Sequence, residues 1–243
     1  MSIIDHKTIL QYVEKHIGEF HAQRLDSLAR LKLTTVLKKK NPYLFRAKAF
    51  ESAGEIVKGI TDAFLSSNEE TIFGDWLERL AIFVNGKSFG GWKSGIEGID
   101  LEFDSENIRY IVSIKSGPNW GNASQVKKMK ASFISAMKTL RTSHSKMQII
   151  AVNGCCYGKD NNPDKGDYFK YCGQRFWEFI SGNDNLFCEI IEPLGFEAKE
   201  RNDKFQELYV PRLNLFTKEF IDEYCFSNGM IDWKKLVKFN SGK

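Results

Sequence analysis

The sequence predicts an α/β fold, with a mixed central β-sheet flanked by helices and helical extensions at both ends. Residues 99–117 read as a β-hairpin, and 147–153 is a short apolar run typical of a buried strand. The intervening segment has helical periodicity, and a strand–helix–strand crossover places the two strands parallel. We expect one domain over 1–243, with a helical N-terminal extension over 1–65, a core over 66–158 and a helical C-terminal part over 159–243.

The composition narrows the class of protein. The chain has 243 residues, and its hydrophobic content of 42% is enough for a sizeable core. A net charge of +4 permits nucleic-acid binding without requiring it. Five cysteines with no Cys-x-x-Cys pair argue against a disulfide scaffold or a zinc ribbon. The absence of a long apolar run or a signal-peptide core leads us to expect a cytoplasmic protein.

Three helices are predicted before the hairpin. The first runs from residue 3 to about residue 40 and stops at Asn41-Pro42, and the second lies within 42–65. The third is opened by a capping box over 67–70 and closed by Asn85-Gly86. The glycine-rich segment that follows could lie along a DNA backbone through Trp92-Lys93, or it could equally be a plain connector.

The hairpin is expected to separate apolar from polar side chains. Residues 104–107 favour a turn, and 108–115 is rich in β-branched and aromatic residues. If the turn pairs Phe103 with Ile108, every second residue shares a face. The apolar face is then Ile99, Leu101, Phe103, Ile108, Tyr110, Val112 and Ile114, and the other face is Asp100, Glu102, Arg109, Ile111, Ser113 and Lys115. We therefore expect Asp100, Ser113 and Lys115 to lie close together.

Helices are predicted on both sides of the second strand. The one before it begins with a capping box over 122–125 and ends near Arg141. Those after it are expected over 168–180, 186–194, 212–224 and 232–239, with a chain break at the proline of 208–211.

Two short motifs on the hairpin carry a family resemblance. Gly98-Ile99-Asp100 and Ser113-Ile114-Lys115 resemble the PD-(D/E)xK nuclease core, in which an Asp on one strand faces an acid-x-Lys on the next. The longer run over 113–125 resembles type II restriction endonucleases of this superfamily, and the likeness extends from about Asn41 to Gly195. This resemblance implies the restriction-endonuclease-like version of the predicted fold.

The resemblance implies a catalytic site on the polar face of the hairpin. Asp100 and Lys115 match the family motif, whereas Ser113 occupies the position of the second acid. Some relatives with Ser-x-Lys recruit a Glu from a helix instead, and Glu78 is our candidate for that ligand. The alternative role for Glu78 is that of an exposed helix residue that pairs with a Lys or Arg. Asp100, Glu78 and the Ile114 carbonyl would then hold one or two Mg²⁺ ions.

DNA contacts are expected around the start of the helix after the hairpin. A helix N-terminus offers free N–H groups to phosphate, although Gln125 has the alternative role of a cap alone. The expected contacts are Asn119, Trp120, Asn122, Ser124, Gln125, Lys127 and Lys93. The polar loop over 159–167 is a further candidate, with a disordered surface loop as its alternative. The basic segment 38–40 is either a phosphate contact or a solvated helix end, and 233–235 could lie at a dimer surface or a DNA surface.

The resemblance implies a type II restriction enzyme, a Mg²⁺-dependent endonuclease. Such an enzyme cuts double-stranded DNA at a short palindrome, acts as a homodimer and leaves 5′-phosphate ends. One alternative is another nuclease of the superfamily that repairs DNA or resolves junctions. A second alternative is a non-catalytic DNA-binding protein with a decayed nuclease core, which Ser113 keeps open. A third is an interaction protein that binds no nucleic acid.

Overall fold

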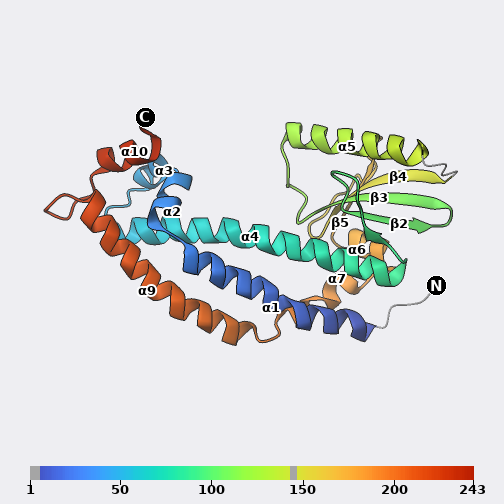
Figure 1. Cartoon of the computed structure of the whole chain (residues 1–243), viewed down its shortest axis with the longest axis horizontal. Coiled ribbons are helices and arrows are strands. Elements are labelled where there is room, and N and C mark those ends of the chain that lie inside the picture. The colour runs from blue at the N-terminus through green and yellow to red at the C-terminus, as the bar shows by residue number, and fades with distance from the viewer. Residues whose placement is uncertain (1–5, 143–146) are drawn as a thin grey trace. The chain divides into compact units, whose positions relative to one another are not determined.

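The structure is a computed structural model and describes residues 6–142 and 147–243 (Figure 1). The helices are α1 His6–Arg30, α2 Leu33–Lys39, α3 Pro42–Ala47, α4 Ala53–Ser88, α5 Ala123–Thr142, α6 Gln174–Ser181, α7 Leu186–Glu189, α8 Ile191–Leu194, α9 Ala198–Tyr224 and α10 Trp233–Ser241. The strands are β1 Trp92–Lys93, β2 Leu101–Ser105, β3 Ile108–Lys115, β4 Gln148–Cys155 and β5 Phe169–Cys172. Within these residues, no helix combines the length and the apolar character that a membrane span needs.

The strands form one mixed sheet in the order β1-β2-β3-β4-β5. The pairs β1–β2 and β2–β3 are antiparallel, whereas β3–β4 and β4–β5 are parallel. Helix α5 makes the crossover from β3 to β4, as the strand–helix–strand pattern requires. The predicted α/β fold with a mixed sheet is confirmed, and the structure adds strand β1 inside the glycine-rich segment before the hairpin.

The predicted hairpin register is wrong by two residues, but the side chains of β2 and β3 lie on the faces of the sheet that were predicted for them. The turn consists of Glu106 and Asn107, which have φ angles of 50° and 65°. Two successive residues with positive φ make the two-residue turn that tight hairpins prefer, so Phe103 pairs with Tyr110 instead of Ile108. Because side chains alternate with a period of two, this slip leaves each of them on its own face.

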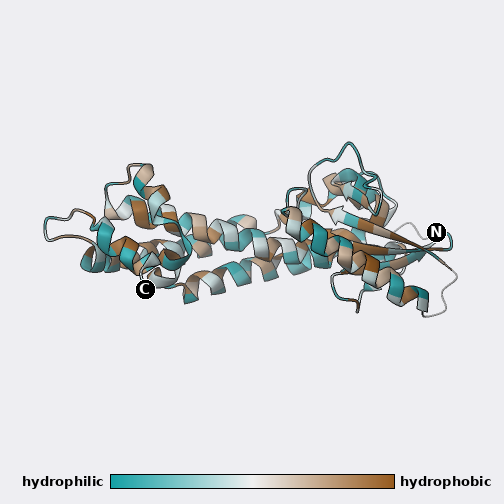
Figure 2. Ribbon diagram, turned by 90° about the horizontal axis from the view of Figure 1, so that it is seen from above, coloured by the Kyte–Doolittle hydropathy of each residue, from teal (hydrophilic) through white to brown (hydrophobic). Residues whose placement is uncertain are grey.

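Helices cover both faces of the sheet (Figure 1). On one face, Ile111 and Ala151 pack against α5 through the buried side chains of Met129, Phe133 and Ala136. On the other face, the Phe103 ring lies 5.3 Å from that of Phe179 on α6 and 4.9 Å from that of Tyr110. Ile99 precedes β2 and joins the α5 cluster, so its predicted place on the opposite face is wrong. In Figure 2 the strands are coloured mostly as hydrophobic, whereas the helices carry both hydrophobic and hydrophilic residues.

The predicted helices before the hairpin are present but have different boundaries. The first helix divides into α1 and α2, because the intervening Lys32 has an extended backbone. The second divides after α3, where Ala49 takes a φ of 57°. The capping box at Ser67 is wrong, since α4 passes through it and the Ser67 hydroxyl donates to the Ala63 carbonyl instead. The same helix continues past Asn85 to Ser88.

After β4, three predicted boundaries are wrong. Residues 169–172 form strand β5, and Gly173 with a φ of 54° separates this strand from α6. The helix expected over 186–194 is two short helices, α7 and α8. Pro211 does not break the chain, because α9 runs through it. The final helix agrees with expectation, and Asp232 caps it by accepting a hydrogen bond from the Lys235 amide.

The chain divides into two compact units. Unit 1 comprises residues up to Ile17 together with Phe73–Phe196, and it contains the sheet. Unit 2 comprises Gly18–Ile72 and Glu197–Lys243, and it is helical. The core of unit 2 includes the buried side chains of Leu28, Val36, Ile56, Phe216 and Phe220.

Candidate active site

Asp100 is held in place at the start of β2. Its amide donates to the Val112 carbonyl at 2.9 Å, which extends the pairing of β2 with β3 by one residue. Its carboxylate oxygen Oδ2 accepts hydrogen bonds from the Ile114 amide at 2.6 Å and from the Ser113 hydroxyl at 3.4 Å. These bonds fix one carboxylate oxygen against β3.

Lys115 meets Asp100 on the same side of the sheet. The Lys115 Nζ lies 3.6 Å from Asp100 Oδ2 and donates a 2.7 Å hydrogen bond to the Ile114 carbonyl. It also lies 5.5 Å from the centre of the Trp120 ring, within range of a cation–π attraction. The side chains of Lys115 and Asp100 are 30% and 21% exposed, so the pair remains open to solvent. The predicted convergence of these two groups is therefore present.

Ser113 is buried and hydrogen-bonded to neighbouring residues. Its backbone carbonyl accepts a 3.1 Å hydrogen bond from the side-chain nitrogen Nδ2 of Asn153 on β4. The Asn153 oxygen accepts in turn from the Trp120 indole at 3.1 Å. Sequence reasoning missed Asn153, although a polar residue at the end of an apolar strand was an available signal. This chain of bonds links the loop after β3 to the strands that carry the site.

Glu78 reaches the site from the last turns of α4. Burial is the main cause that raises the pKa of its carboxyl group, and the neighbouring Asp100 carboxylate raises it further. Lys93 on β1 and Lys115 oppose this shift, and Lys93 Nζ lies 3.9 Å from Glu78 Oε1. Glu78 is thus close enough to Asp100 to repel its charge, and it also makes the Lys pair that was the alternative interpretation.

The loops after β3 and β4 lie side by side. The Tyr157 amide donates to the Ser116 carbonyl at 3.1 Å, and Lys170 Nζ donates to the Pro118 carbonyl at 2.9 Å. Asp160 in the second loop pairs with Lys165 at 3.0 Å. Both loops therefore emerge at the end of the parallel strands where Lys115 lies.

A comparison with protein families decides the class of protein. The family described as Type II restriction endonuclease EcoO109I matches residues 7–202, which is most of the chain. This chain belongs to the EcoO109I family of type II restriction endonucleases. The predicted membership of the restriction endonucleases is confirmed, and the family is one of site-specific deoxyribonucleases. No curated protein matches the chain in a sequence search.

The matched span of the EcoO109I family contains Glu78, Asp100 and Lys115. Restriction endonucleases typically use metal ions, and the donor atoms at this site suit Mg²⁺. Mg²⁺ is usually held by one or two carboxylates together with water and substrate phosphate. Asp100 Oδ1 accepts no hydrogen bond from the residues that the structure describes, and Glu78 contributes a second carboxylate. Those residues contain no group of three or more His, Cys, Asp or Glu placed as metal ligands.

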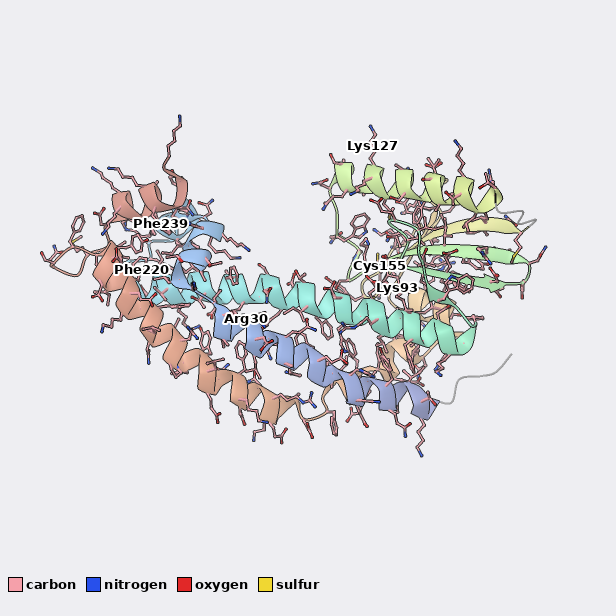
Figure 3. All side chains as sticks on the ribbon, viewed as in Figure 1. Arg30, Lys93, Lys127, Cys155, Phe220 and Phe239 are labelled. Atoms are coloured by element: carbon pink, nitrogen blue, oxygen red, sulfur yellow. The ribbon has the colours of Figure 1, made fainter. Side chains whose placement is uncertain are left out.

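The residues predicted to contact DNA have varied surroundings. Asn122 and Gln125 form the predicted capping box, in which the side-chain oxygen of each residue accepts a hydrogen bond from the backbone N–H of the other. Lys127 points away from the sheet on α5 (Figure 3), and Asn119 and Ser124 are exposed. Trp120 and Lys93 are engaged at the site itself, as described above. Their roles in DNA binding remain predictions.

Proposed function

We propose that the protein is a Mg²⁺-dependent endonuclease that hydrolyses double-stranded DNA at a short palindromic site and leaves 5′-phosphate ends. Membership of the EcoO109I family supports a DNA substrate. The observation that carries the proposal is the 3.6 Å approach of Lys115 Nζ to Asp100 Oδ2, within electrostatic range of the Glu78 carboxylate.

In this proposal, groups from the hairpin and from α4 have separate roles in the reaction. Asp100, Glu78 and the Ile114 carbonyl would hold the ion, which when bound would lower the pKa of a water molecule and neutralise phosphate oxygens. The hydrogen bonds that Asp100 Oδ2 accepts from Ser113 and Ile114 hold that carboxylate against β3. Lys115 positions the attacking water and stabilises the charge that develops on the phosphate. Ser113 takes no direct part, because its side chain is buried and bonded to Asp100.

A palindromic target also implies a homodimer. The two strands of a palindrome are related by a two-fold axis, and a protein with the same symmetry presents one active site to each strand. We therefore propose that two copies of the chain act together on one site.

Digestion of a plasmid tests the function directly. With Mg²⁺ the protein is expected to convert the plasmid to a fixed set of fragments, and EDTA is expected to stop the reaction, because the carboxylates alone cannot activate water. Sequencing the fragment ends would give the recognition site. Binding without cleavage would favour a decayed nuclease core, and cleavage of branched DNA alone would favour a junction-resolving enzyme.

Glu78→Gln is expected to lower the cleavage rate by about 10²-fold or more, because it removes one of the two carboxylates that hold the ion. Glu70→Gln is the matched control on the same helix and is expected to keep wild-type activity, since Glu70 is exposed. Initial rates on the plasmid measure both. Wild-type activity in Glu78→Gln would move the second carboxylate to Glu97 or Glu102.

The raised pKa of Glu78 adds a pH dependence to the wild type. Mg²⁺ binds the ionised carboxylate, and a pKa raised by burial and by Asp100 lets protons compete at a higher pH than for an ordinary Glu. The Mg²⁺ concentration for half-maximal cleavage is therefore expected to rise as the pH falls.

A further inference from the structure

Unit 2 concentrates positive charge where α2, α3 and α10 meet. Residues 36–50 contain five Lys or Arg and no acid, and residues 230–243 contain four Lys and one acid. The one acid, Asp232, is engaged as the cap of α10. The whole chain has a net charge of only +4, so this region differs sharply from the average.

Direct contacts hold these two segments together. The Asn240 side chain donates to the Leu37 carbonyl at 2.6 Å and to the Lys40 carbonyl at 3.2 Å. Arg46 of α3 lies 5.5 Å from the Trp233 ring of α10, and Lys38 of α2 lies 5.6 Å from the Phe239 ring. Phe239 is labelled on α10 in Figure 3. The positive charges therefore lie on one folded element rather than on separate tails.

The charges are available to an external partner. Lys38, Arg46, Lys234 and Lys238 are exposed. In the part of the chain that the structure describes, none of the four has a carboxylate partner, whereas Lys235 pairs with Glu223 at 3.8 Å. Two other exposed cations of unit 2, Arg30 and Lys58, do pair with carboxylates, those of Asp26 and Asp62.

An apolar pocket opens between these cations. Its volume is about 440 Å³, and its walls include Tyr43, Trp233 and Val237, with Arg46, Lys234 and Lys238 around them. The Tyr43 side chain is 61% exposed. Cations that follow a phosphate backbone, together with aromatic rings on which bases stack, are the combination by which proteins bind single-stranded nucleic acid.

We propose that this surface, made of Tyr43, Trp233, Lys38, Arg46, Lys234 and Lys238, binds single-stranded DNA and seats one unpaired base in the pocket. Duplex DNA keeps its bases stacked inside the helix and would use the cations alone. A second copy of the chain is the other possible occupant, but a two-fold contact would place this positive surface against itself. Like charges facing each other oppose such a contact, so an anionic strand fits better.

The test measures binding of the full chain to a fluorescent oligothymidylate over a series of salt concentrations. EDTA is present throughout, so the outcome does not depend on whether the hairpin site cleaves DNA. The triple variant Arg46→Ala, Lys234→Ala, Lys238→Ala is expected to bind at least about tenfold more weakly. The slope of log affinity against log salt concentration should also become shallower by about two. Three cations are removed, and each phosphate contact with a single strand contributes about 0.7 to that slope.

A matched variant controls for net charge. Lys199→Ala, Lys204→Ala, Lys218→Ala removes the same charge from exposed positions on α9 in unit 2 and is expected to bind as the wild type does. Tyr43→Ser is expected to weaken binding by about tenfold, whereas Tyr43→Phe keeps the ring and the affinity. Equal losses in the two triple variants would overturn the proposal. A change of oligomeric state in the first triple variant would identify a self-association surface instead.

Discussion

Asp100→Asn is expected to lower the rate of DNA cleavage by about 10³-fold or more while leaving DNA binding largely intact. Asparagine has the size of aspartate, and its oxygen can still accept the hydrogen bond that the Ile114 amide donates at 2.6 Å. It lacks the negative charge that holds a divalent ion next to the phosphate. Initial rates on plasmid DNA with Mg²⁺, and affinity for the same DNA with EDTA, separate the two effects.

Asp104→Asn is the matched control for this variant. Asp104 lies on the same strand, but its carboxylate pairs with Arg109 through two contacts of 2.7 Å. The control removes the same charge from β2 at a distance from Lys115, and it is expected to cleave DNA at close to the wild-type rate. Unimpaired cleavage by Asp100→Asn would show that this hairpin does not carry the active site.

The hairpin shows how the convergence of Asp100 and Lys115 could be predicted from sequence even though the register was not. The turn chemistry of 104–107 was compatible with more than one pairing, and the positive φ angles of Glu106 and Asn107 selected the shorter turn. Because both pairings keep the alternation of side chains, Asp100 and Lys115 stayed on one side. The alternation is a property of each strand alone, which is why it could be predicted.

Helix boundaries were less predictable because packing overrode local signals. Ser67 has the sequence of a cap, yet α4 continues through it and buries Ile60, Leu65 and Ile72. Pro211 lies inside α9, whose Phe205 and Phe216 are held in the core of unit 2. Such tertiary contacts outweigh a cost of about 3 kcal/mol for a proline within a helix. They depend on residues distant in sequence and leave no local trace.

The surroundings of the site were predictable only in part. Glu78 stood out because its neighbours one turn away on the helix, Gly74 and Ala81, are small. Its approach to Asp100 depends on how α4 lies against the sheet, which no local pattern encodes. The hydrogen bond of Trp120 with Asn153 joins a loop to a strand residue 33 positions away, and it likewise could not be predicted from a local sequence pattern.

Lys115→Ala is expected to lower cleavage by about 10³-fold, because it removes the cation that orients the attacking water and balances the charge on the phosphate. The Lys115 Nζ lies 2.7 Å from the Ile114 carbonyl and 3.6 Å from Asp100 Oδ2, and among the residues that the structure describes no other Lys or Arg pairs with Asp100. Lys93 approaches Glu78 only to 3.9 Å, and its side chain is mostly exposed. Cleavage rates and DNA affinity are measured as for Asp100→Asn.

Lys130→Ala is the control for this second variant. Lys130 carries the same charge on α5, but its ammonium pairs with Asp167 at 3.1 Å and lies over the Tyr168 ring. We expect its cleavage rate to stay within a fewfold of the wild type. If Lys115→Ala cleaved as fast as Lys130→Ala, a positive charge at this position would be dispensable. The attacking water would then have to be oriented by Asp100 and Glu78 alone.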